Sequence, residues 1–280
     1  MRDEAEHKGG SRAGDPGARR SRDAEGVRIE VTRDGHVATV EFERPGVLNA
    51  IAPDDLPRLA EALREAGDGS RVVVVRGAGG AFSAGDDLNA TADLSPGEWR
   101  SVVEGFHELT RVALALEVPV IAAIDGVCVG GAFELACSCD LRIASTRSRL
   151  GCPEVGIGLV VSNASTVLLP RLCGSGYASK LMLTGRLVPA EEAYVHGLLD
   201  AVAPPDELEA RARWLAEEIA ARAPLAVRAT KRLLVAGLGE AVEQAMARET
   251  AALVELCETA DMREGFAAFR EKRQASFSGS

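Results

Sequence analysis

Apolar and polar residues alternate along two short segments near the start of the chain. These segments, VRIEV and HVATVEF, flank Asp34 and Gly35. Alternation on both sides of an Asp-Gly pair predicts a β-hairpin. The next apolar positions share the spacing of a helix with one buried face, at Leu56, Leu59, Ala60 and Leu63.

Uninterrupted apolar runs then alternate with helical patterns. The runs at 72–75, 120–124 and 141–144 are short, as expected of strands buried on both faces. A helical pattern lies around 102–116, and another helix opens at Gly130 and Gly131. This alternation predicts an α/β core.

Beyond Ala164 the apolar patterns are mostly helical. The stripes lie at 208–219, 226–236, 240–257 and 263–269. Residues 1–25 contain almost no apolar side chains, so we expect a disordered tail there. The predicted organisation is therefore a tail (1–25), an α/β core (26–203) and a C-terminal helical region (204–280).

Composition narrows the class of protein. The chain has 280 residues, 46% of them hydrophobic, which is ample for a large core. A net charge of −10 disfavours nucleic acid and anionic membranes as partners. The sequence contains neither an apolar run of membrane-spanning length nor a secretory signal pattern, so we expect a cytoplasmic protein.

The six cysteines lie mostly within apolar segments. This placement is typical of reduced core thiols in a cytosolic protein. Cys137 and Cys139 form a C-x-C pair, but no second cysteine or histidine cluster accompanies them. We therefore expect no metal site.

Two glycine-rich turns, at 83–87 and 129–132, each follow a predicted buried strand. Glycine allows the backbone to approach a ligand closely, and a helix start offers unpaired N–H groups. Two such turns facing one cleft would supply paired donors for a developing oxyanion. Neither turn has the lysine of a P-loop or the glycine spacing of a dinucleotide site, and ordinary loop chemistry is the alternative explanation.

Glu134 and Glu154 are the candidate acid and base. Glu134 lies one helical turn after Gly131 among apolar residues, and Glu154 lies in a glycine-punctuated apolar loop. Two carboxyl groups in one apolar cleft would have separated pKa values, so that one serves as acid and the other as base. The structural alternatives are a favourable helix-dipole position for Glu134 and a buried salt bridge for Glu154.

These residues lie within a series of ordered motifs that resembles the crotonase, or enoyl-CoA hydratase/isomerase, superfamily. The motifs are RPGVLNAI (44–51), AFSAGDDL (81–88), IDGVCVGGAFELACSCDLRIAS (124–145), GCPEVGIGL (151–159), LPRLCG (169–174), LTGRLVPAEEAYVHGLLDAV (183–202) and EGFAAFREKR (264–273). The resemblance covers residues 27–275 and is closest to the enoyl-CoA hydratases. Agreement of so many motifs in order makes it specific.

The resemblance implies a spiral of ββα units followed by helices that build trimers or dimers of trimers. It also implies an acyl-CoA thioester substrate, with coenzyme A as part of that substrate and no separate metal or redox cofactor. By position, the Asp86 and Gly131 amides would form the oxyanion hole, and Glu134 and Glu154 would be catalytic. The positions implied to bind the substrate or its CoA portion are Arg44, Val47, Ala84, Gly85, Asp87, Leu88, Gly130, Phe266 and Lys272, the last two at the adenine and phosphates, across a subunit contact.

The implied reaction is syn addition of water across the 2,3 double bond of an enoyl-CoA. In this scheme Glu134 deprotonates water for attack at C3, and Glu154 supplies a proton to C2. Asp86 departs from the family pattern, because hydratases often have alanine there. Ala132 replaces a frequent glycine, and the segment VSNAS (161–165) replaces a glycine-rich turn.

Three alternatives remain open on the sequence alone. One is a double-bond isomerase, which would need a single acid/base carboxyl group. Another is a different crotonase reaction, such as decarboxylation or C–C cleavage. The third is a non-catalytic CoA- or RNA-binding homologue, although the early helix DDLPRLAEALREA (54–66) has more acidic than basic residues.

Overall fold

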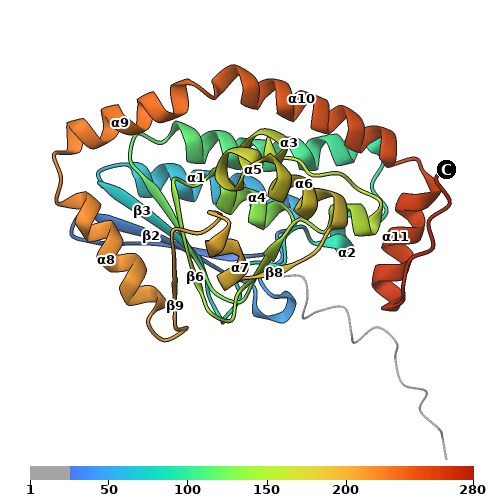
Figure 1. The fold of residues 1–280 in the computed structure, drawn as a ribbon, viewed down its shortest axis with the longest axis horizontal. Helices are drawn as coiled ribbons and strands as arrows, with labels where there is room; N and C mark the ends of the chain where they lie inside the picture. Colours follow the sequence, from blue (N-terminus) through green and yellow to red (C-terminus); the bar gives the residue numbers. More distant parts are fainter. Residues whose placement is uncertain (1–25) are drawn as a thin grey trace, which may run out of the picture.

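The computed structural model describes residues 26–280, and the expected tail at 1–25 lies outside them. A six-stranded sheet forms the centre, in the order β1-β2-β3-β4-β6-β9 (Figure 1). Its strands are β1 (Arg28–Asp34), β2 (Val37–Glu43), β3 (Val72–Gly77), β4 (Val120–Ile124), β6 (Leu141–Ser145) and β9 (Ala201–Ala203). The predicted hairpin is confirmed, since β1 and β2 pair antiparallel with Asp34 opposite Val37.

The other strands of this sheet pair in parallel, and helices cover both faces. Alternate residues of β3 point to opposite faces, which explains its continuous apolar run. Val73 and Val75 join the main core with the helices α1 (Leu56–Gly67) and α3 (Pro96–Ala115). Val72 and Val74 pack against α8 (Leu208–Ala220) on the other face.

A second sheet was not foreseen from the sequence. It consists of β5 (Val127–Val129), β7 (Arg149–Gly151) and β8 (Val188–Pro189), each too short to give a clear periodic pattern. β5 leads directly into α4 (Gly131–Ser138), and β7 leads through Pro153 into the 3-10 helix η4 (Glu154–Ile157). Because β5 and β7 pair side by side, this small sheet brings the segments that carry Glu134 and Glu154 together.

The remaining helices complete the fold. They are the short elements η2 (Pro45–Val47), η3 (Pro53–Asp55) and α2 (Leu88–Thr91), then α5 (Ser165–Cys173), α6 (Ser175–Thr184), α7 (Ala190–Val195), α9 (Pro224–Ala236), α10 (Gly239–Leu256) and α11 (Ala260–Glu271). Figure 1 shows α9 and α10 arching over α3 and α1, with α11 beyond the far end of α10. α10 packs on α3, and α11 packs on η4, so the C-terminal helices cover the parts of the core that carry the candidate site.

Within residues 26–280, no helix combines the length and apolarity needed to cross a bilayer. In the same part of the chain, no group of three or more His, Cys, Asp or Glu side chains is arranged to hold a metal ion. All six cysteines are free thiols, and four of them are buried.

Candidate active site

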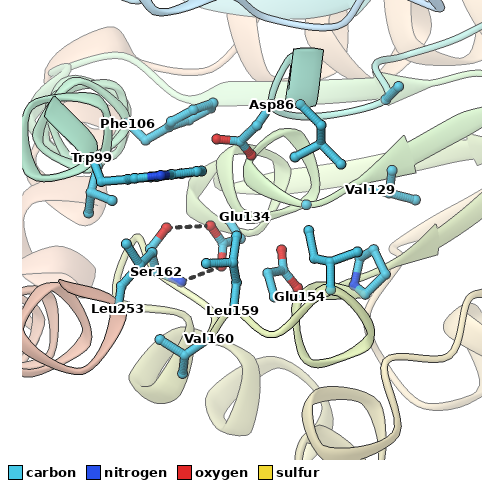
Figure 2. Close-up of a pocket in the computed structure, with 16 residues that line it drawn as sticks. Asp86, Trp99, Phe106, Val129, Glu134, Glu154, Leu159, Val160, Ser162 and Leu253 are labelled. Carbon is cyan, nitrogen blue, oxygen red and sulfur yellow. Dashed lines mark hydrogen bonds between the residues drawn. The ribbon is translucent and has the colours of Figure 1, made fainter. Parts of the chain in front are cut away.

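A largely apolar cavity lies where the two glycine-rich turns meet α3, η4 and the segment 159–162. The centre of a water molecule can occupy about 70 Å³ of this cavity. Figure 2 shows the carboxyl groups of Asp86, Glu134 and Glu154 around this space. The lining residues are Ala84, Asp86, Leu88, Trp99, Val103, Phe106, Val129, Gly130, Glu134, Pro153, Glu154, Ile157, Leu159, Val160, Ser162 and Leu253.

The two glycine-rich turns pack closely against each other because glycine has no side chain. Gly85 has a φ of +81°, and a Cβ there would lie 2.5 Å from the Val129 carbonyl oxygen. Gly131 has no room for a side chain either, because a Cβ would lie 2.5 Å from the Phe106 ring. These contacts fix the spacing between the turn that carries Asp86 and the start of α4.

Both predicted oxyanion amides are free of backbone acceptors. The isolated bridge between Ile51 and Asp86 uses the Gly85 carbonyl and the Asp87 amide, which leaves the Asp86 N–H without a backbone acceptor. Gly131 is the first residue of α4, so its N–H has no acceptor within the helix. The Gly131 N–H instead donates to Oδ2 of Asp86 at 3.3 Å.

The Asp86 carboxyl group is therefore part of the site. The residue is half-buried by area because the cavity reaches it, while its carboxyl group lies deep in the protein. Burial raises the pKa of Asp86 to about 6, although the Gly131 amide and its own amide act in the opposite direction. Sequence reasoning assigned Asp86 through its amide alone and did not place its carboxyl group at Gly131.

Glu134 is held by a cradle of four donors from the segment 162–165. Its Oε1 accepts from the Ser162 N–H at 2.7 Å and from the Ser165 hydroxyl at 3.1 Å. Its Oε2 accepts from the Ser162 hydroxyl at 2.9 Å and from the Asn163 side-chain amide at 2.8 Å. A carboxylate offers about four lone-pair positions, so these donors saturate it.

The cradle is itself supported by Glu249 from α10. The Glu249 carboxylate accepts from the Ala164 N–H at 2.8 Å, the Thr166 N–H at 2.9 Å and the Thr166 hydroxyl at 2.6 Å. It thereby caps the start of α5. Burial raises the pKa of Glu134 to about 8, the Ser162 donors oppose that shift, and the nearby Glu249 and Asp86 charges add to it.

Glu154 differs from Glu134 in having an unpartnered oxygen. Its Oε2 is buried without a hydrogen-bond partner. Burial, followed by the charge of Glu134, raises the pKa of Glu154 well above its usual value. A Cβ on Gly130 would lie 3.5 Å from Oε1 of Glu154 and 3.6 Å from Oδ2 of Asp86, so both carboxyl groups lie beside Gly130.

Several positions implied to bind the substrate also lie at this site. Ala84, Leu88 and Gly130 line the cavity. Asp87 instead accepts from the first amides of α2 and pairs with Arg44 at 2.7 Å, with both side chains largely buried. This pair ties the loop 44–50 to the turn that carries Asp86, which is a structural role additional to any contact with CoA.

The remaining three positions lie away from the cavity wall. Val47 ends η2 and is half-buried, on the outer loop that follows β2. Phe266 is buried, with its ring edge-on to Trp99 at 6.0 Å, so within this chain it packs behind the cavity. Lys272 is exposed at the end of α11.

Sequence reasoning missed the supporting residues. The segment VSNAS was noted only as a departure from a glycine-rich turn, yet its Ser and Asn side chains are the donors that a buried carboxylate requires. Glu249 lies 85 residues from Ala164, and no local pattern links them. Phe106 belongs to the predicted helical stripe at 102–116, whereas Trp99 lies before it in the first turn of α3, and which helix face meets the cavity is a tertiary property.

The sequence and the fold both match known proteins. The family model "Enoyl-CoA hydratase/isomerase" matches residues 32–280. The chain is 37% identical over 249 residues to the short-chain-enoyl-CoA hydratase of Clostridium acetobutylicum, covering 88% of this chain and 95% of the relative. It is 35% identical over 252 residues to the crotonyl-CoA hydratase of Syntrophomonas wolfei, covering 89% and 97%.

A solved structure of an enoyl-CoA hydratase/isomerase from Pseudoalteromonas atlantica T6c superimposes with a TM-score of 0.80 at 31% identity, covering 89% of this chain and 99% of that one. The fold is accordingly the α/β crotonase fold with C-terminal helices. The chain belongs to the enoyl-CoA hydratase/isomerase family.

Proposed function

We propose that this protein is an enoyl-CoA hydratase, which adds water across the 2,3 double bond of an acyl-CoA thioester. The observation that carries the proposal is the pair of buried carboxyl groups, Glu134 and Glu154, on one apolar cavity beside the Asp86 and Gly131 amides. The named hydratases among the relatives support the same reaction class.

In this mechanism the thioester carbonyl oxygen binds at the two amides. Negative charge moves onto that oxygen as water attacks C3, and donors already aimed at it stabilise the enolate. The apolar walls from Trp99, Phe106 and Leu159 exclude bulk water, which strengthens these hydrogen bonds.

The two glutamates have different roles because their surroundings differ. Four donors stabilise the charged form of Glu134, whereas Glu154 has a buried oxygen without a hydrogen-bond partner. Glu134 therefore ionises first and takes a proton from water, once a serine hydroxyl turns aside to free a lone pair. The new C3–O bond sends the π electrons toward the thioester, and Glu154 gives its proton to C2.

Subunit assembly is part of the proposal. Large apolar side chains are exposed on α6, α7, α8, α9 and α11, at Leu183, Val195, Trp214, Leu225, Leu233, Leu234 and Phe269. Exposed apolar groups of this size are typical of subunit interfaces. We propose a homotrimer or a dimer of trimers. We also propose that the protein lies in the cytoplasm, because six free thiols suit a reducing compartment. Light scattering at micromolar concentration tests the assembly, and a 29.4 kDa monomer would contradict it.

Turnover of an enoyl-CoA in ¹⁸O-labelled water tests the reaction. The 3-hydroxyacyl product should carry the label, and Glu154→Gln should lower kcat by roughly 10²–10⁴-fold, as expected for an acid–base group. A double-bond isomerase would give product without label. Full activity in Glu154→Gln would refute the two-carboxyl mechanism.

A further inference from the structure

The Asp86 carboxyl group lies where the substrate oxygen is expected. Its Oδ2 accepts from the Gly131 N–H at 3.3 Å, and its own N–H also interacts with the carboxyl group. These are the two amides to which the proposed function assigns the thioester oxygen. The carboxyl oxygen and the substrate oxygen therefore require the same donors.

We propose that the Asp86 carboxylate occupies the oxyanion hole of the empty enzyme and must leave it when an acyl-CoA thioester binds. Asp86 is then a specificity-determining residue, because it sets the affinity for an acyl-CoA thioester relative to the affinity for free CoA. The inference rests on the proposed function, since it assumes that the cavity receives a thioester.

The competition follows from acceptor strength. An ionised carboxylate is a stronger hydrogen-bond acceptor than a neutral thioester carbonyl, so it holds the Gly131 amide against the incoming ligand. No ion pair links Asp86 to a described Lys, Arg or His side chain that could hold the displaced charge. The titratable groups that interact with it are Glu134 and Glu154, and Arg44 is engaged by Asp87.

The competition depends on pH. Desolvation raises the pKa of Asp86 to about 6, against the opposing effect of the Gly131 amide and its own amide. A neutral carboxyl group accepts hydrogen bonds less strongly and can donate one to the thioester oxygen. Thioester affinity should therefore rise as the pH falls through the pKa of Asp86.

Calorimetric titration of the full-length enzyme with two probes tests this. One probe is a saturated short-chain thioester, butyryl-CoA, which has no double bond to hydrate, and the other is free CoA. The measured quantity is the ratio of their affinities between pH 5 and pH 8. This ratio removes the ionisation of the CoA phosphates, which also titrate near pH 6 and are common to both probes.

The wild-type ratio should rise about tenfold from pH 8 to pH 5, which corresponds to about 1.4 kcal/mol. In Asp86→Asn, a neutral side chain of the same shape, the ratio should stay near the low-pH wild-type value at every pH. In Asp86→Ala it should likewise be independent of pH and exceed the wild-type value at pH 8. Free CoA should bind all three proteins alike.

A wild-type ratio that does not change with pH and equals the ratios of both variants would overturn the inference while leaving the proposed function intact. If neither probe binds the wild-type protein, the proposed function fails and the inference fails with it. Thermal unfolding of both variants confirms that a changed affinity does not reflect a lost fold.

Discussion

Replacing Glu249 by glutamine tests whether the support behind Glu134 positions it. Each Glu249 oxygen accepts from a backbone amide, Oε2 from Ala164 and Oε1 from Thr166. Glutamine must place its NH₂ group at one of these oxygens. A backbone N–H cannot turn around, so either orientation sets two donors against each other.

The size of the effect follows from that conflict. Leaving one buried donor without an acceptor costs about 1–3 kcal/mol, and the Glu249 side chain is buried. For a domain of this length, that corresponds to a fall in Tm of roughly 2–12 °C. Activity should fall as well, because the displaced 164–166 backbone carries Ser165 and directly follows Ser162 and Asn163, the residues that hold Glu134.

A second readout separates positioning from general damage. The Glu249 charge raises the pKa of Glu134, so its removal should lower that pKa. The low-pH limb of the kcat profile should then move to lower pH in Glu249→Gln. Loss of stability alone would not move this limb.

Glu243→Gln is the matched control, since it makes the same chemical change on the same helix. Glu243 is exposed and pairs with Arg111 at 2.9 Å, and surface pairs of this kind contribute about 0–1 kcal/mol. Chemical unfolding and kcat profiles should be compared at one protein concentration, because assembly couples to stability. A Glu249→Gln protein as stable and as active as Glu243→Gln would refute the reasoning.

Three further expectations follow from the site. Glu154→Gln should unfold at the same denaturant concentration as the wild type or a higher one, because Oε2 of Glu154 has no partner to lose; a marked drop would reveal a contact that matters for stability. Gly131→Ala should lower kcat and destabilise the protein by about 1–3 kcal/mol, since the added methyl group would lie 2.5 Å from the Phe106 ring. Unchanged kinetics would show that the Phe106 ring moves to make room. The fold raises the pKa of Asp86 from 3.8 to about 6. The stability of the wild type relative to Asp86→Asn should therefore be greatest below pH 4 and fall by at most about 3 kcal/mol as the pH rises to about 6. Unfolding curves at pH 4, 5, 6 and 7 test this, and a constant difference between the two proteins would contradict it.

The sequence predicted the parts of the fold that repeat a strong pattern. The hairpin, the buried strands β3, β4 and β6, and the long helices follow from apolar spacing, because burial on one or both faces imposes that spacing. The strands β5, β7 and β8 have two or three residues each, too few for any period to show. Their pairing, which joins the two glutamates, depends on contacts between distant segments.

The candidate site divides in the same way. The cavity that brings Asp86, Glu134 and Glu154 together was predicted from glycine-rich turns and motif order, and their catalytic roles remain predictions. The direction of the Asp86 side chain was not foreseen, because a backbone role says nothing about a rotamer. The packing of Phe266 on Trp99 was not foreseen either, and its contact with the CoA nucleotide remains a prediction.

The tight contact between α11 and η4 affects how the enzyme is made. A Cβ on Gly265 would lie 2.4 Å from the Ile157 carbonyl, and one on Gly158 would lie 2.6 Å from the Met262 Cα, so the two backbones touch. The loop that carries Glu154 therefore rests on a helix near the end of the chain. A ribosome delivers α11 after the sheet, which has had time to fold by then. The growing chain can thus acquire its core early, but the loop that carries Glu154 gains its packing partner only after α11 has emerged.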